Sequence, residues 1–71
     1  MKSHTYALEL TWEGNRGAGT ERYDAYGREY RVRQPGKPDL LGTADVVFRG
    51  VPDRHNPEDL YLAALSSCHM L

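Results

Sequence analysis

The sequence has a single cysteine, Cys68, which excludes a disulfide within the chain. The other soft metal ligands are three histidines, and none of these residues shows the C-x-x-C or H-x-x-x-H spacing typical of zinc sites. A chain of 71 residues buries only about 60% of its unfolded surface and is marginally stable alone. We therefore expect an oligomer or further sequence to supply stability, with no metal and no cofactor.

The sequence also lacks an excess of charge and a long apolar run. Nine basic and ten acidic residues give a net charge of −1, which offers no electrostatic reason to expect a nucleic acid or an anionic membrane as partner. The first ten residues, MKSHTYALEL, have no apolar core of a signal peptide, and no run approaches the ~20 apolar residues of a membrane span. Together with one free thiol, these features predict a soluble cytoplasmic protein without nucleic-acid or membrane contacts.

The first 49 residues carry strand patterns. Tyr6, Leu8, Leu10 and Trp12 fall on one face of an alternating segment, as expected for a half-buried strand, and the glycines that follow predict a flexible turn. Further segments are rich in Thr, Tyr and Val, which favour strands. The predicted strands cover 4–13, 20–23, 28–33 and 44–49, with a join at Tyr26-Gly27 and a turn at 35–38.

From about residue 57 to the end, the pattern predicts a helix. Asn56 can cap its first turn, and Pro57 at the first helical position loses no hydrogen bond. Glu58 and Asp59 place negative charge near the positive end of the helix dipole. Apolar residues then extend almost around the helix, so we expect it to be buried on most faces inside a larger core.

Four blocks in order resemble the OsmC/Ohr family, named for osmotically inducible protein C and organic hydroperoxide resistance protein. The blocks are WEGNRGAGT, YGREYRV, GKPDLLGTADVVFRG and NPEDLYLAALSSCHML. The most specific is Asn-Pro-Glu-x-Leu, followed by a helix of small residues and a cysteine ten positions after the glutamate. The resemblance covers nearly the whole chain.

The resemblance implies an α+β, OsmC-like fold, with an antiparallel sheet followed by a long central helix in an intertwined homodimer. It implies that residues 1–71 are the N-terminal half of one such domain. The implied activity is thiol-dependent reduction of organic hydroperoxides, with a dithiol or a lipoylated protein as reductant. In the family, a second cysteine in the C-terminal half resolves the oxidised first one.

The resemblance assigns the peroxide-attacking thiol to Cys68. Such a reaction needs a thiolate that passes to sulfenic acid. A free thiol of pKa about 8.5 is mostly protonated at neutral pH, so a cation must favour its ionised form. The alternative is that Cys68 is a small buried apolar residue, which is the common fate of a lone cysteine.

The resemblance places the activating cation at Arg16, in the turn after the first strand, and assigns its orientation to Glu58. Arg28 is a rival for the same role, whereas we interpret the remaining arginines as surface charge. Glu58 has the simpler alternative of balancing the helix dipole. Ten residues separate Glu58 from Cys68, about 15 Å along a helix, so one arginine is not expected to touch both within one chain. Either the arginine moves between them or a partner subunit supplies one of the groups, and the second option suits an intertwined dimer.

His69 and the apolar residues of the predicted helix are weaker candidates for a functional role. His69 follows Cys68, but adjacent helical residues point about 100° apart, so the imidazole is not expected to face the thiol. The apolar residues of the helix either line a pocket for the organic part of a peroxide or pack in a core, and packing is favoured. They are Tyr61, Leu62, Leu65 and Met70.

Two other classes of function compete with the peroxidase. One is a non-catalytic OsmC-like protein that binds an apolar small molecule or serves as a structural dimer. The other is an inactive fragment that lacks the resolving cysteine. A second cysteine about 60 residues further along the full-length chain would favour the enzyme.

Overall fold

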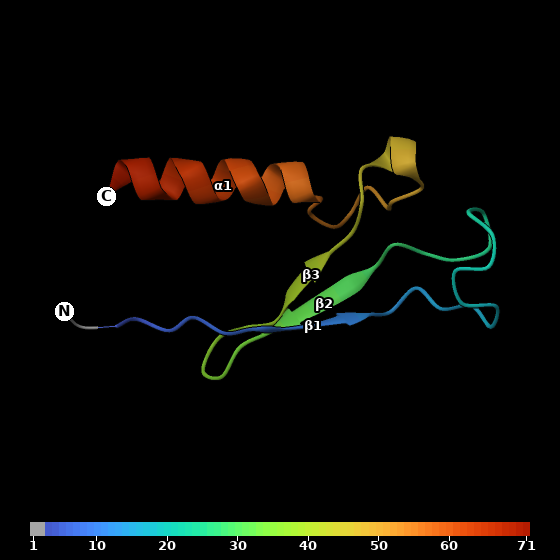
Figure 1. The fold of residues 1–71 in the computed structure, drawn as a ribbon. Helices are drawn as coiled ribbons and strands as arrows, with labels where there is room; N and C mark the ends of the chain where they lie inside the picture. The colour runs from blue at the N-terminus through green and yellow to red at the C-terminus, as the bar shows by residue number, and fades with distance from the viewer. Residues whose placement is uncertain (1–2) are drawn as a thin grey trace.

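The computed structural model describes residues 3–71 (Figure 1). A three-stranded antiparallel sheet is followed by a single turn of 3-10 helix and one α-helix. The elements are β1 (Glu9–Trp12), β2 (Tyr30–Arg33), β3 (Leu40–Gly42), η1 (Val46–Phe48) and α1 (Pro57–Met70). The chain therefore has the predicted mixture of an antiparallel sheet and a C-terminal helix.

The sheet follows chain order, β1-β2-β3, so each strand pairs with the next. Leu10 lies opposite Val32, and Val32 in turn lies opposite Leu40. This register places three apolar residues in a row across the sheet, on one face, as period-2 alternation requires. The turn predicted at 35–38 is confirmed, since the Lys37 N–H donates to the Gln34 carbonyl oxygen at 3.3 Å and Gly36 has a φ of 77°.

The strands predicted at 20–23 and 44–49 are wrong. Residues 17–26 form consecutive turns, in which the Glu21 N–H donates to the Ala18 carbonyl and the Ala25 N–H to the Arg22 carbonyl. In the second segment the Asp45 side chain accepts from the Val47 N–H at 3.0 Å and thereby caps η1. Local hydrogen bonds from turn-forming residues thus override the strand preference of Val and Tyr.

The sequence patterns also missed β3 and overextended two strands. Within 4–13 only Glu9–Trp12 is strand, and within 28–33 only Tyr30–Arg33. Leu40–Gly42 becomes a strand because the turn before it returns the chain alongside β2. Three residues are too few for alternation to be visible, so register with β2 defines this strand rather than its own composition.

The helix begins as predicted. Asn56 Oδ1 accepts from the Asp59 N–H at 2.9 Å, and Asp59 Oδ2 accepts from the Asn56 N–H at 3.2 Å, which forms a capping box. Pro57 occupies the first helical position. These contacts satisfy free amides of the first turn, so α1 has a well-defined start independent of any packing.

The burial of α1 inside a larger core stays a prediction, because the helix is exposed within residues 3–71. No apolar side chain among residues 3–71 is buried, and Leu62 and Leu65 remain 61% and 52% exposed. The radius of gyration is 14.9 Å, against about 11 Å for a compact domain of this length. The accessible surface of 6087 Å² likewise exceeds the roughly 4,500 Å² expected for a folded chain of this mass. The physical reason is that no element of the described chain covers the helix.

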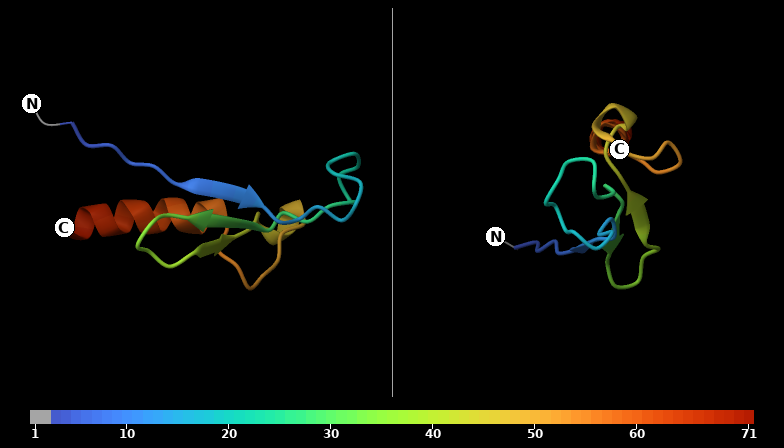
Figure 2. Two further views of the ribbon diagram at one scale, coloured as in Figure 1. Left: turned by 90° about the horizontal axis from the view of Figure 1, so that it is seen from below. Right: turned by 90° about the vertical axis from the view of Figure 1, so that its right-hand side faces the viewer.

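The elements extend along one axis. The loop between β1 and β2 lies at one end, and the C-terminal end of α1 lies at the other, a relation that holds in two perpendicular views (Figures 1 and 2). The Cα trace measures 47 × 22 × 21 Å. Groups carried by the loop and by the last turn of the helix are therefore far apart within one chain.

Candidate functional site

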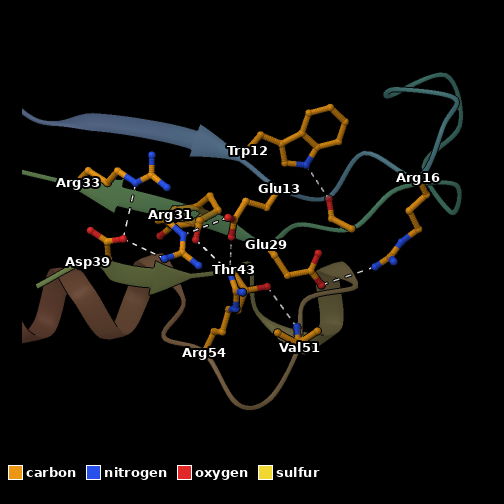
Figure 3. A network of polar contacts seen from close by, with 12 residues as sticks. Trp12, Glu13, Arg16, Glu29, Arg31, Arg33, Asp39, Thr43, Val51 and Arg54 are labelled. Carbon is orange, nitrogen blue, oxygen red and sulfur yellow. Dashed lines mark hydrogen bonds and ion pairs between the residues drawn. The ribbon is translucent and has the colours of Figure 1, made fainter.

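The loop between β1 and β2, residues 13–29, carries the arginine that was expected to activate the thiol. Its two ends are held together at a neck. The Glu13 N–H donates to the Glu29 carbonyl and the Gly27 N–H to the Gly14 carbonyl, both at 2.8 Å. Trp12 Nε1 donates to the Gly27 carbonyl at 2.9 Å (Figure 3). The loop is therefore anchored to the sheet through three hydrogen bonds.

Two glycines make this neck sterically feasible. A Cβ on Gly14 would lie 1.9 Å from the Gly27 carbonyl oxygen, so no larger residue fits without moving the backbone. A Cβ on Gly27 would lie 2.1 Å from Glu29 Oε2 and 2.6 Å from Arg16 Nη2. The second glycine thus leaves space for the carboxylate and the guanidinium to meet beside the neck.

Arg16 meets Glu29 across this space. Arg16 Nη2 lies 3.7 Å from Glu29 Oε1, and the two side chains are 63% and 17% exposed (Figure 3). The turn that carries Arg16 is shaped by Asn15, whose Oδ1 accepts from the Gly17 and Gly19 N–H groups at 2.9 and 3.1 Å. Arg16 is therefore a largely exposed cation beside one half-buried carboxylate.

Arg28, the rival candidate, is engaged within the loop. Its guanidinium carbon lies 3.8 Å from the centre of the Tyr26 ring and 4.4 Å from that of Tyr23. Its two terminal nitrogens donate to the Tyr26 and Tyr23 carbonyl oxygens. Because both ring and carbonyl contacts hold this guanidinium inside the loop, the geometry favours Arg16 as the cation available to another group.

Glu58 and Cys68 lie on α1. Glu58 is in the first turn, where its charge faces the positive end of the helix dipole, and Cys68 is in the last turn. Both residues are exposed, and Cys68 is a free thiol. Cys68 shares this exposure with the rest of the last three turns of α1, which no element among residues 3–71 covers.

The structure does not bring Arg16, Glu58 and Cys68 together in one chain. Arg16 belongs to the loop at one end of the molecule and Cys68 to the opposite end (Figures 1 and 2). The carboxylate within reach of Arg16 in residues 3–71 is Glu29. Sequence reasoning missed Glu29, because its proximity to Arg16 depends on the loop folding back at Gly27.

A second polar cluster, on the sheet, was interpreted as surface charge. Arg31 on β2 contacts Glu13 Oε2 at 3.1 Å and Asp39 Oδ2 at 2.9 Å (Figure 3). Arg54 contacts Glu13 Oε1 at 3.4 Å and donates to the Tyr30 carbonyl at 3.1 Å. These arginines link β2 and the segment before α1 to Glu13, which directly follows β1, so the surface charges form ion pairs that the sequence interpretation did not include.

The electrostatics of this cluster follow from its hydrogen bonds. The hydrogen bond and charge of Arg31, supplemented by Arg54, lower the pKa of Glu13 from its ordinary value. Asp39 and Glu13 together raise the pKa of Arg31. Both groups therefore stay charged at neutral pH, and their ion pairs connect the loop neck with the segment that leads into the helix.

Comparison with models of known protein families, with curated proteins and with solved structures gives no match for this chain. Within residues 3–71, His, Cys, Asp and Glu side chains form no group of three or more that could hold a metal ion. The same part of the chain contains no helix with the length and apolar character needed to cross a membrane.

Proposed function

We propose that this chain is part of a thiol-dependent peroxidase with an OsmC-like fold, which reduces organic hydroperoxides through Cys68. The observation that carries the proposal is an exposed thiol on a helix whose Asn-Pro-Glu start is built as a capping box. An accessible thiol can meet a peroxide, which a packed core cysteine cannot. A reducing, cytoplasmic location suits an enzyme that must regain its thiol in each cycle.

The chemistry assigned to Cys68 is a displacement at oxygen. The thiolate attacks the outer peroxide oxygen, the O–O bond breaks, and an alkoxide leaves and takes a proton to become an alcohol. Cysteine is oxidised to the sulfenic acid, and the peroxide is reduced. A second thiol, from a cysteine in the remainder of the full-length protein, then forms a disulfide with release of water, and a dithiol or lipoylated protein restores both thiols.

The activating cation is assigned to Arg16, supplied by a second copy of the chain. Within one chain Arg16 and Cys68 lie at opposite ends, so a two-fold symmetric pair of antiparallel copies would place each loop near the other copy's thiol (Figure 2). Glu58 of the receiving helix would then orient the incoming guanidinium. A homodimer also covers the exposed apolar residues of α1, such as Leu62 and Leu65.

Intact mass measurement of the full-length protein before and after cumene hydroperoxide tests this proposal. We expect the gain of one oxygen atom, or the loss of two hydrogen atoms where a second cysteine closes a disulfide. The Cys68→Ser variant should show neither change. An unmodified Cys68 after treatment with excess peroxide would refute the peroxidase.

A binding protein is the second candidate, because an open groove of about 790 Å³ lies between the sheet and the start of α1. Val32 and Leu40 line it from the sheet, and Leu60 lines it from the helix. A fluorescent fatty acid titrated into the Cys68→Ser variant distinguishes the two. Saturable binding without peroxidase activity in the wild-type protein would favour the binding protein, whereas turnover without saturable binding would favour the enzyme.

A further inference from the structure

Arg28 makes contacts that go beyond those of a surface cation. Its guanidinium lies against the rings of Tyr23 and Tyr26, at 4.4 and 3.8 Å from their centres. It donates to the carbonyl oxygen of Tyr26 and, at 2.5 Å, to that of Tyr23. A second guanidinium, from Arg49 at the end of η1, lies 5.7 Å from the Tyr23 ring. Tyr23, Tyr26 and Arg28 therefore form an aromatic clamp within the loop.

A short series of contacts leads from this clamp to Arg16. The Tyr26 ring packs edge-on against Trp12, with centroids 5.8 Å apart and an interplanar angle of 85°. Trp12 in turn donates to the Gly27 carbonyl at the neck. Glu29, the residue after Arg28, carries the carboxylate 3.7 Å from Arg16. Movement of the clamp would thus change the positions of both the Arg16 and the Glu29 side chains.

We propose that Arg28 is a positioning residue, which closes the loop through the aromatic clamp and thereby fixes where Arg16 lies relative to Glu29. Arg28 touches no reacting group in this arrangement. It acts through the backbone of residues 23–29, whose carbonyl groups it binds. Its effect on catalysis rests on the proposed peroxidase, whereas its effect on the loop does not.

The clamp requires arginine rather than any cation. A planar guanidinium can lie against aromatic rings and donate to two carbonyl groups at once, because its five N–H donors are arranged in a fixed fork. A lysine ammonium keeps the charge but lacks this plane and fork. Arg28→Lys is therefore expected to open the clamp, although more mildly than Arg28→Ala. Arg22 is the matched control, since this exposed arginine of the same loop pairs with Asp24 at 3.9 Å.

The first test uses Trp12, the only tryptophan among these 71 residues, as a reporter. In ¹⁵N-labelled full-length protein, Arg28→Ala and Arg28→Lys should shift the Trp12 indole N–H resonance and the Arg16 Nε resonance. Arg22→Ala should move neither signal. Unchanged signals in the folded Arg28→Lys variant would overturn the proposal, as would equal shifts in Arg22→Ala.

The second test is a double-mutant cycle on peroxide reduction. Arg28→Lys should slow the reaction about 10-fold in the wild-type background and not at all in Arg16→Ala, because residues that act as a unit are not additive. An equal slowing in both backgrounds would mean that Arg28 acts directly, and the proposal would be wrong. If instead Cys68→Ser retains full turnover, the peroxidase fails while the resonance test still decides the clamp.

Discussion

The loop of residues 13–29 and the helix α1 differ in what holds them. The loop lacks regular secondary structure, yet its neck hydrogen bonds, Arg16–Glu29 pair and aromatic clamp fix it from several sides. The helix is regular and well capped, yet its apolar side chains contact little of the described chain. The loop thus has its partners within the chain, whereas no element among residues 3–71 covers the helix.

This difference bears on the proposed chemistry, because the reactive groups are divided between the two regions. The loop contributes Arg16, while the helix contributes Glu58 and Cys68. In a single copy of the chain, the thiol would therefore lack the cation that is proposed to activate it. Peroxidase activity is therefore expected to depend on the assembly of two copies. Substitutions in the helix should remove the reactive thiol, whereas substitutions in the loop should remove its activation.

The largest effect is expected at Cys68. Cys68→Ser should abolish turnover of cumene hydroperoxide, because a hydroxyl in place of the thiol cannot pass to a sulfenic acid. The measurement is steady-state peroxide consumption with a dithiol. Circular dichroism provides the control, since an exposed serine should leave the helix content unchanged. Turnover above the uncatalysed rate would contradict the assignment.

Arg16 should come next. Arg16→Ala should slow peroxide reduction on the order of 10²-fold, as expected when one charged group that stabilises the reacting anion is removed. Glu58→Gln should slow it less, because the cation remains but is poorly placed. If Arg28→Ala slows the reaction on this scale while Arg16→Ala does not, the roles of the two arginines are reversed.

The two neck glycines should separate stability from positioning. Gly14→Ala places a Cβ against a backbone oxygen, so it should lower the free energy of unfolding by about 1–3 kcal/mol. Gly27→Ala meets only the ends of two flexible side chains, so it should disturb the Arg16–Glu29 pair with a smaller loss of stability. Urea unfolding of the full-length protein measures both. Equal losses of unfolding free energy in the two variants would contradict this difference between Gly14 and Gly27.

The smallest effect concerns the cluster on the sheet. The pKa of Glu13 is lowered, chiefly by its hydrogen bond with Arg31, so the cluster's contribution is complete above the ordinary glutamate value of about 4.3. That contribution is lost as pH falls through the lower value of the folded state. Glu13→Gln should therefore reduce the urea midpoint slightly at neutral pH, with the difference shrinking below about pH 4.

Glu9→Gln is the control for this cluster, since Glu9 lies on β1, which Glu13 directly follows, and its carboxylate accepts only from Thr11 among the described residues. It should leave the urea midpoint unchanged at neutral pH. A Glu13→Gln effect that stays constant from neutral pH to strongly acidic pH would show that the ion pairs do not stabilise the fold.

The sequence predicted elements whose signals are local. The start of α1 could be predicted because Asn56 and Pro57 act within one turn. The strand at Tyr30–Arg33 and the turn at 35–38 could be predicted for the same reason. Segment 44–49 was wrongly predicted as a strand, because Val and Phe favour strands. Asp45 instead caps a turn of 3-10 helix there.

The candidate site was less predictable, because it depends on tertiary contacts. Glu29 and the clamp around Arg28 come together only when the loop folds back on itself. The pairing of Arg31 with Glu13 and Asp39 depends on strand register, which single segments do not specify. Burial of α1 was predicted from its own apolar pattern, but burial requires a covering element that residues 3–71 do not provide.

The central claim is that the loop of one copy activates the thiol of another, and complementation between two inactive variants tests it most directly. Full-length Cys68→Ser and Arg16→Ala are unfolded together, refolded as a mixture and assayed for peroxide reduction. Random pairing would give mixed dimers with one intact site each, so we expect recovery of roughly a quarter of the wild-type activity. Activity no higher than the mean of the two variants assayed separately would contradict the claim, because it would mean that Arg16 and Cys68 act within the same chain.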